Sequence, residues 1–164
     1  MIINSEQEML RFGTDFAKRL VSTGGRAGGT PAARSRQAST VGETARSGPV
    51  ETRVIELLGD VGAGKTTFTR GLAKGLGIKE PVTSPSFTIS KSYALPNSNG
   101  RLIHYDFYRL PDPGLMLDDL RENLEKPENI IVIEWGESVA NILPENHIKI
   151  EIKYNDDNSR EVIL

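Results

Sequence analysis

The sequence predicts a mixed α/β fold, in which one β-sheet carries helices on both faces. Two apolar runs, Val54–Leu58 and Ile130–Ile133, have the nearly uninterrupted character of strands that are buried on both sides. Residues 87–108 contain two strand-like runs around turn-forming residues at 96–100, which predicts an antiparallel hairpin. Buried strands that alternate with amphipathic helices are typical of a sheet between helical layers.

The predicted helices follow from apolar periodicity and from the residues at which they begin. Ser5 and Glu8 have the spacing of a capping box. Four apolar residues then recur at helical intervals: Met9, Phe12, Phe16 and Leu20. The remaining predicted elements are helices at 65–75 and 115–124 and a strand pair at 148–154 and 160–164.

The composition is that of an ordinary globular protein, with 37% hydrophobic and 26% charged residues. A length of 164 residues predicts a single domain over 1–164. The net charge of −2 argues against a strongly basic nucleic-acid-binding protein, so we expect no DNA partner. The absence of cysteine excludes disulfides, thiolate metal sites and a cysteine nucleophile. No run approaches the ~20 apolar residues of a membrane span, and the N-terminus lacks signal-peptide features, so we expect a soluble, cytoplasmic protein without a membrane partner.

Residues 22–50 differ from the rest of the chain. These 29 residues contain no Leu, Ile, Met, Phe, Trp or Tyr, and they carry four Arg against one Glu. Such a segment buries too little apolar surface to offset its ordering entropy. We therefore expect a flexible low-complexity insertion within the domain, which leaves a net charge of −5 on the other 135 residues. A basic arm that touches RNA or an acidic partner is the alternative interpretation.

A phosphate-binding loop is the most specific motif in the chain. The segment GDVGAGKT at 59–66 matches the pattern G-x-x-x-x-G-K-[ST] in full, between a predicted strand and a predicted helix. Its glycines let backbone N–H groups approach phosphate oxygens, and the helix N-terminus favours an anion. Lys65 has the reach for the β- and γ-phosphates, and the Thr66 hydroxyl is a Mg²⁺ ligand. The motif predicts a P-loop NTPase-like mixed sheet and the binding of ATP or GTP. The predicted nucleotide-binding residues of this loop are Gly59, Asp60, Val61, Gly62, Ala63, Gly64, Lys65, Thr66 and Thr67.

Acidic residues follow two of the predicted strands, where a phosphate-loop site needs a carboxylate. Glu134 ends the apolar run and is the better candidate for the metal shell. Asp106 is expected to orient the attacking water or to hold the metal through water. A hydroxyl-rich loop before the predicted hairpin offers Ser84 and Ser86 as sensors of the γ-phosphate. Trp135 either packs in the core or stacks near the nucleotide, and the sequence pattern alone favours the core.

The two histidines have structural interpretations at this point. His104 lies inside an apolar strand, which is typical of a hydrogen-bonded structural histidine. His147 precedes a predicted strand among polar residues, so we expect it on the surface.

These segments together resemble the TsaE (YjeE) family of small bacterial ATPases, which supports formation of N6-threonylcarbamoyladenosine in tRNA. The resemblance covers 5–21 and 51–164. The matching segments, in the same order and spacing, are GDVGAGKTTF at 59–68, TSPSF at 83–87, HYDFYRL at 104–110 and Glu134-Trp135.

The resemblance implies ATP and Mg²⁺ as ligands. It also implies that ATP hydrolysis resets a complex with the TsaD transferase and the TsaB subunit, with tRNA contacted indirectly. Thr66 and Glu134 match the Mg²⁺ ligands of the family, and Asp106 matches a required acid. Trp135 matches a tryptophan beside the nucleotide, and Arg160 falls where the family tends to have an arginine near it. The predicted catalytic residues are Lys65, Asp106 and Glu134.

Three features depart from the family pattern. Ser86 replaces a threonine, so the hydroxyl group is retained. Met9 lies where the first helix of the family often has a threonine that contacts the nucleotide. The insertion at 22–50 replaces a connection that is normally short.

Other functions of a phosphate loop remain open at this stage. A small-molecule or nucleoside kinase is the alternative, but such kinases often carry an arginine-rich lid, whereas Arg109 and Arg121 are far apart in the sequence. A regulatory GTPase would need the guanine-reading motif N-K-x-D, which the sequence lacks. A structural nucleotide-binding subunit would bind ATP without releasing phosphate.

Overall fold

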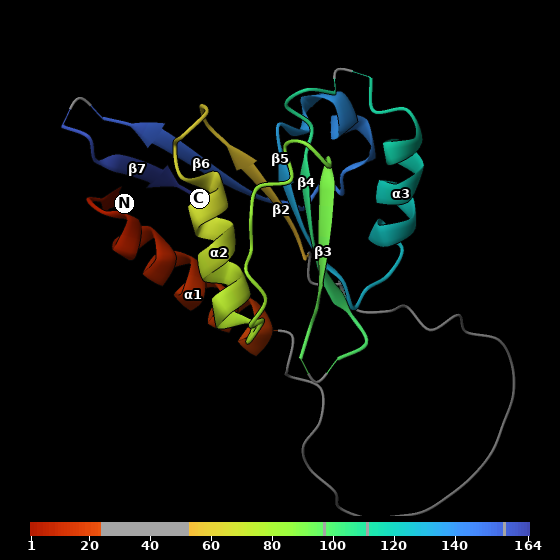
Figure 1. The fold of residues 1–164 in the computed structure, drawn as a ribbon, viewed down its shortest axis with the longest axis horizontal. Helices are drawn as coiled ribbons and strands as arrows, with labels where there is room; N and C mark the ends of the chain where they lie inside the picture. The colour runs from red at the N-terminus through yellow and green to blue at the C-terminus, as the bar shows by residue number, and fades with distance from the viewer. Residues whose placement is uncertain (24–52, 97, 111, 156) are drawn as a thin grey trace, which may run out of the picture.

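The computed structural model describes residues 1–23, 53–96, 98–110, 112–155 and 157–164. Within these residues, a seven-stranded sheet has the strand order β1-β7-β6-β2-β5-β4-β3 (Figure 1). The strands are β1 (Ile2–Ile3), β2 (Val54–Leu58), β3 (Ser90–Ala94), β4 (Arg101–Asp106), β5 (Ile130–Glu134), β6 (Ile148–Tyr154) and β7 (Arg160–Ile163). The helices are α1 (Glu6–Thr23), α2 (Lys65–Gly75), α3 (Leu115–Leu124) and the 3₁₀ helix η1 (Gly136–Ile142).

The sheet is parallel in its centre and antiparallel at both edges. The four central strands, β6, β2, β5 and β4, run parallel to one another. The hairpin strand β3 pairs antiparallel with β4, and β7 and β1 form an antiparallel edge beside β6. Parallel strands end at the same edge of a sheet, so the residues that follow β2, β4 and β5 are neighbours in space. The predicted mixed sheet is confirmed.

Helices cover both faces of the sheet, as the sequence predicts. Figure 1 shows α1 and α2 together on one side and α3 on the other. The alternation of side chains along each strand supplies both layers. Leu57 and Leu102 belong to the apolar cluster that includes residues of α1 and α2. Ile103 and Ile133 belong to the second cluster, which includes Leu120 of α3.

Glycines allow α1 and α2 to pack backbone against backbone. A Cβ atom added to Gly71 of α2 would lie 2.4 Å from the carbonyl oxygen of Leu10, and one added to Gly13 of α1 would lie 2.4 Å from that of Phe68. The ring of Phe68 packs against Phe12 of α1, with ring centroids 5.4 Å apart. This close packing sets the position of α2, and therefore of the loop that precedes it.

Helix α1 begins with the predicted cap, since the N–H of Glu8 donates to the Ser5 hydroxyl over 3.2 Å.

A buried tyrosine holds α3 against the other face. The hydroxyl of Tyr105 on β4 donates to Asp119 Oδ2 over 2.6 Å and accepts from Asn123 Nδ2 over 3.0 Å. Burial, together with the Asp119 hydrogen bond, raises the pKa of the Tyr105 phenol well above its usual range. The phenol therefore stays a neutral donor, and it ties the helix to the strand that ends at the candidate site.

Several element boundaries differ from those predicted. The strand expected from Phe87 begins at Ser90, because the N–H groups of Thr88 and Ile89 both bond back to the Pro85 carbonyl in a turn. Ile89 has a positive φ of 65°, and Phe87 is 86% exposed. The next strand ends at Asp106 instead of residue 108. The two-residue strand β1 was not predicted, because its pairing with β7 is not visible in local periodicity.

The prediction that the insertion begins at residue 22 is wrong by two residues. Ser22 and Thr23 are the last residues of α1, and the Ser22 hydroxyl donates to the carbonyl oxygen of Arg19 over 2.9 Å. The remainder of the expected insertion, 24–50, lies outside the described residues.

His147 is not on the surface, contrary to expectation. Its side chain is only 9% exposed, and its Nε2 lies 2.9 Å from Glu56 Oε2. Its Nδ1 lies 2.6 Å from the carbonyl oxygen of Pro144. The polar sequence around His147 gave no sign of this pair, because Glu56 is 91 residues away in the chain.

None of the helices in the described ranges is both long enough and apolar enough to cross a membrane.

We predict that Gly71→Ala lowers the free energy of unfolding by about 1–3 kcal/mol, because the new methyl group overlaps the backbone of α1. Helix propensity alone predicts the opposite, a gain of about 1 kcal/mol. Urea unfolding measures the difference, with the exposed Lys74→Ala on the same helix as control. A Gly71→Ala protein as stable as wild type would contradict the packing described here.

Candidate active site

The loop between β2 and α2 has the backbone geometry of a phosphate cradle. Gly59, Gly62 and Gly64 have φ angles of 132°, 81° and 112°, in the region that favours glycine. Gly64 caps α2 without a side chain, and the first helical bond runs from the Phe68 N–H to the Gly64 carbonyl over 2.9 Å. The N–H groups ahead of Phe68 therefore lack intrahelical acceptors and are oriented for an anion at the positive end of the helix.

Lys65 brings a buried positive charge into this loop. Its ammonium donates to the carbonyl oxygens of Gly59 (2.7 Å) and Asp60 (3.0 Å) and lies 4.0 Å from Glu134 Oε2. It also lies 4.5 Å from the ring centroid of Trp135. Burial lowers the pKa of Lys65, against the attraction of nearby carboxylates. An added anion would offset this desolvation and stabilise the charged form.

Glu134, at the end of β5, connects the strand to the helix that follows the loop. Its Oε1 accepts a hydrogen bond from the Thr66 hydroxyl over 3.2 Å and lies 2.9 Å from His104 Nε2. The carboxylate side chain is 5% exposed. Glu134 is in register with Leu57 of β2 and with Asp106 of β4, so the parallel pairing places it beside the loop.

Asp106, at the end of β4, is connected to the hydroxyl-rich loop. The Ser86 hydroxyl donates to Asp106 Oδ2, and the N–H of Tyr108 donates to Oδ1 over 3.1 Å. The hydroxyl oxygens of Ser84 and Ser86 are 2.7 Å apart. The turn that begins at Pro85, because of which β3 starts only at Ser90, thus brings two serine hydroxyls beside Asp106.

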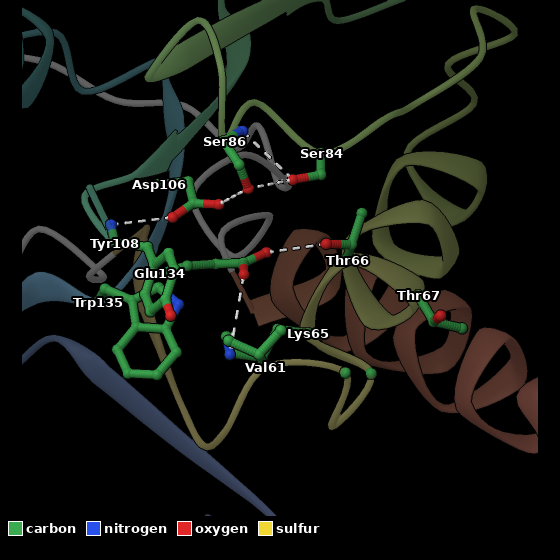
Figure 2. Close-up of a pocket in the computed structure, with 12 residues that line it drawn as sticks. Val61, Lys65, Thr66, Thr67, Ser84, Ser86, Asp106, Tyr108, Glu134 and Trp135 are labelled. Carbon is green, nitrogen blue, oxygen red and sulfur yellow. Dashed lines mark hydrogen bonds and ion pairs between the residues drawn. The ribbon is translucent and has the colours of Figure 1, made fainter. Parts of the chain in front are cut away.

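These side chains line one cavity of about 220 Å³. Figure 2 shows the Ser84–Ser86–Asp106 chain of hydrogen bonds above the Glu134 carboxylate, with Lys65 below it and Thr66 to its right. Trp135 is half-buried: it lines this cavity and also packs against the apolar cluster under α3. The lining residues are Val61, Gly62, Gly64, Lys65, Thr66, Thr67, Ser84, Ser86, Asp106, Tyr108, Glu134 and Trp135.

The remaining predicted residues lie around the cavity and do not line it. Gly59 and Asp60 offer their carbonyl oxygens to Lys65, and Ala63 is fully buried beneath the loop. Arg160 lines a neighbouring cavity of about 280 Å³, together with Met9 of α1. The other residues of this neighbouring cavity are Ser5, Glu6, Gly62, Gly64 and Thr67, so the two cavities meet at the phosphate loop.

The donor set fits Mg²⁺ in the company of a polyphosphate. The Thr66 hydroxyl and Glu134 Oε1 are 3.2 Å apart, close to the roughly 3 Å between neighbouring ligands of an octahedral Mg²⁺. No cluster of three or more His, Asp or Glu side chains suited to a metal occurs in the described part of the chain. Protein oxygens would thus supply two ligands, which is typical of Mg²⁺ sites that are completed by water and phosphate.

Two residues of the site, Tyr108 and His104, are not among those predicted from the sequence. Tyr108 lines the cavity, with its ring centroid 4.8 Å from that of Trp135. His104 contacts Glu134, whereas its place in an apolar strand favours a purely structural role. One signal was available for His104: it lies two residues before Asp106 on the same strand, and such residues share a face of the sheet.

The fold and the loop define a protein of the phosphate-loop class. The sequence model of the family described as "Threonylcarbamoyl adenosine biosynthesis protein TsaE" matches residues 29–162. The chain belongs to the TsaE family.

Known relatives agree with this assignment. A Treponema pallidum protein named "tRNA threonylcarbamoyladenosine biosynthesis protein TsaE" is 41% identical over 130 residues, which are 74% of this chain and 93% of that protein. The Bacillus subtilis protein of the same name is 41% identical over 114 residues, 66% of each chain. The crystal structure of Bacillus subtilis YdiB superposes with a TM-score of 0.53 at 38% identity, and the match spans 66% of this chain and 64% of that one.

We predict that Trp135 reports ligand binding, because it is the single tryptophan of the chain and contacts Lys65. Titration with inorganic triphosphate and Mg²⁺ is expected to change its fluorescence in a saturable way. In Lys65→Met the apparent affinity should fall about tenfold or more, since a charge-assisted hydrogen bond is lost. Lys74→Met, an exposed lysine of the same helix, is the control. Equal affinities of wild type and Lys65→Met would contradict the assigned role of the loop.

Proposed function

We propose that this protein binds and hydrolyses ATP with Mg²⁺, as an accessory subunit in the synthesis of N6-threonylcarbamoyladenosine in tRNA. Membership of the TsaE family supports the place in tRNA modification. One structural observation carries the ATPase proposal. The phosphate loop, the Thr66–Glu134 pair and the Ser86–Asp106 pair face one cavity at the carboxyl edge of the parallel strands.

Each side chain has a role that follows from its surroundings. The Lys65 ammonium and the free amides of the loop would bind the phosphates and offset the charge that develops on them. Thr66 and Glu134 would hold Mg²⁺, which when bound polarises the phosphate oxygens.

Asp106 would orient a water molecule toward the γ-phosphate. Its Oδ2 is fixed by the Ser86 hydroxyl and its Oδ1 by a backbone N–H, so its direction is set before any ligand arrives. Ser84 and Ser86 would contact the γ-phosphate. A rotation of the Ser86 hydroxyl toward phosphate would break its hydrogen bond to Asp106, and Ser84 is linked to that bond through Ser86, so the nucleotide state is coupled to this loop.

The neighbouring cavity suits the rest of the nucleotide. It shares the loop glycines with the main cavity, and Arg160 and Met9 form part of its wall. The buried Met9 offers an apolar surface in place of a hydroxyl contact. We propose that the nucleoside end of ATP lies here, with Arg160 beside it.

The partners proposed for the protein are the TsaD transferase and the TsaB subunit, in the cytoplasm, with tRNA contacted through them. In this scheme hydrolysis resets the assembly, and the threonylcarbamoyl bond is made elsewhere. Slow hydrolysis by the chain alone and faster hydrolysis with the partners are the corresponding expectations.

We predict that Glu134→Gln lowers phosphate release from ATP at least about 100-fold while the fold survives, because the amide cannot serve as an anionic ligand to Mg²⁺. Phosphate release is measured with and without TsaD and TsaB, and the folded state by circular dichroism. Glu145→Gln, an exposed acid that is not among the carboxylates acting on Lys65, is the control and should retain wild-type turnover.

Unchanged turnover in Glu134→Gln would reject the assigned site. Binding of ATP without phosphate release, even in the presence of both partners, would reject hydrolysis in favour of a structural subunit. Phosphoryl transfer to a small acceptor instead of water would identify a kinase.

A further inference from the structure

His104 is a buried histidine with one bonded and one unbonded ring nitrogen. Its side chain has no exposed surface, and its Nε2 lies 2.9 Å from Glu134 Oε1. Its Nδ1 is buried without a hydrogen-bond partner among the described residues. Because a carboxylate only accepts hydrogen bonds, Nε2 carries the proton and donates it.

A histidine with one unpaired buried nitrogen contributes little to the stability of the fold. A buried polar atom without a partner destabilises the folded state, whereas an apolar side chain of similar size would fill the same space without that penalty. His147 provides the contrast within the chain, since both of its nitrogens face acceptors, Glu56 Oε2 and the Pro144 carbonyl. What His104 supplies is therefore its single contact to Glu134.

The contact controls which partner Glu134 faces. Oε1 is shared by His104 and the Thr66 hydroxyl, while Oε2 is 4.0 Å from the Lys65 ammonium. Oε2 and the Lys65 ammonium form a long ion pair of 4.0 Å, and without the His104 donor the carboxylate is free to shorten it to direct contact. Such a pair would withdraw Glu134 from Thr66 and would compete with phosphate for the ammonium.

We propose that His104 is a positioning residue, which holds the Glu134 carboxylate beside the Thr66 hydroxyl and keeps it from a closer ion pair with Lys65, at the expense of a buried unpaired nitrogen. The inference rests on the proposed function, because it gives the Thr66–Glu134 pair the task of holding Mg²⁺. Partners that orient metal ligands in this way commonly change metal affinity 10- to 100-fold when removed.

The test compares three variants of the full chain. His104→Leu removes the donor and the unpaired nitrogen together, and His104→Gln keeps an N–H near the position of Nε2. His147→Leu is the matched control, because it breaks a buried His–Glu pair of the same 2.9 Å length that contacts none of the site residues. Two quantities are measured: the melting temperature without ligand, and the Mg²⁺ concentration at half-maximal Trp135 fluorescence change with a non-hydrolysable ATP analogue.

The expected result separates stability from metal binding. His104→Leu loses one contact to Glu134 and removes one unpaired nitrogen, so it should melt closer to wild type than His147→Leu, which loses two contacts. His104→Leu should need about tenfold more Mg²⁺, and His104→Gln should need nearly the wild-type concentration. His147→Leu should melt lower and keep the wild-type Mg²⁺ dependence.

Three results would overturn the inference: a wild-type Mg²⁺ midpoint in His104→Leu, a His104→Leu protein that is unfolded or melts as low as His147→Leu, or a His104→Gln protein as impaired as His104→Leu. A wild-type protein without any Mg²⁺ response would reject the proposed function as well. A response shared equally by wild type and His104→Leu rejects this inference alone.

Discussion

The arrangement of the site depends on the contacts of the buried Glu134 carboxylate. It ends a fully buried strand, accepts the Thr66 hydroxyl from α2, contacts His104 on β4 and lies within 4.0 Å of the Lys65 ammonium. A buried carboxylate is stable only when donors or cations surround it, so the positions of three elements are tied to one side chain. The parallel register of β4, β5 and β2 makes this possible, because it fixes where each strand ends.

The other requirement is the position of α2, which is set by its packing against α1 on the same face of the sheet. The glycine contacts at Gly13 and Gly71 bring the two helices closer than side chains would allow. Phe68 then packs on Phe12 and Phe16, only three residues after Lys65. Core packing and the site are thus coupled through one turn of helix, so a shift of α1 moves the Thr66 hydroxyl relative to Glu134.

Much of this arrangement was predictable from local patterns. The phosphate loop, the strands around it and the acids at 106 and 134 are encoded in short segments. The carboxyl ends of parallel strands necessarily lie at the same edge of the sheet. What the sequence did not reveal depends on long-range contacts. The pairing of Ile2–Ile3 with β7, the His147–Glu56 pair and the contact of His104 with Glu134 all join residues 30 or more positions apart. The predicted start of the strand at Phe87 is wrong, because Pro85 begins a turn that the local apolar alternation does not reveal. The same turn delivers Ser86 to Asp106, so the error falls at a functional position.

A crystal structure of the protein with Mn²⁺ in place of Mg²⁺ and a non-hydrolysable ATP analogue would show where the metal and the phosphates bind. One anomalous peak is expected about 2.2 Å from the Thr66 hydroxyl oxygen and beside the Glu134 carboxylate. The β- and γ-phosphates are expected on the loop amides and the Lys65 ammonium. A manganese peak remote from Thr66 and Glu134, or a polyphosphate bound away from the loop, would contradict the assigned site.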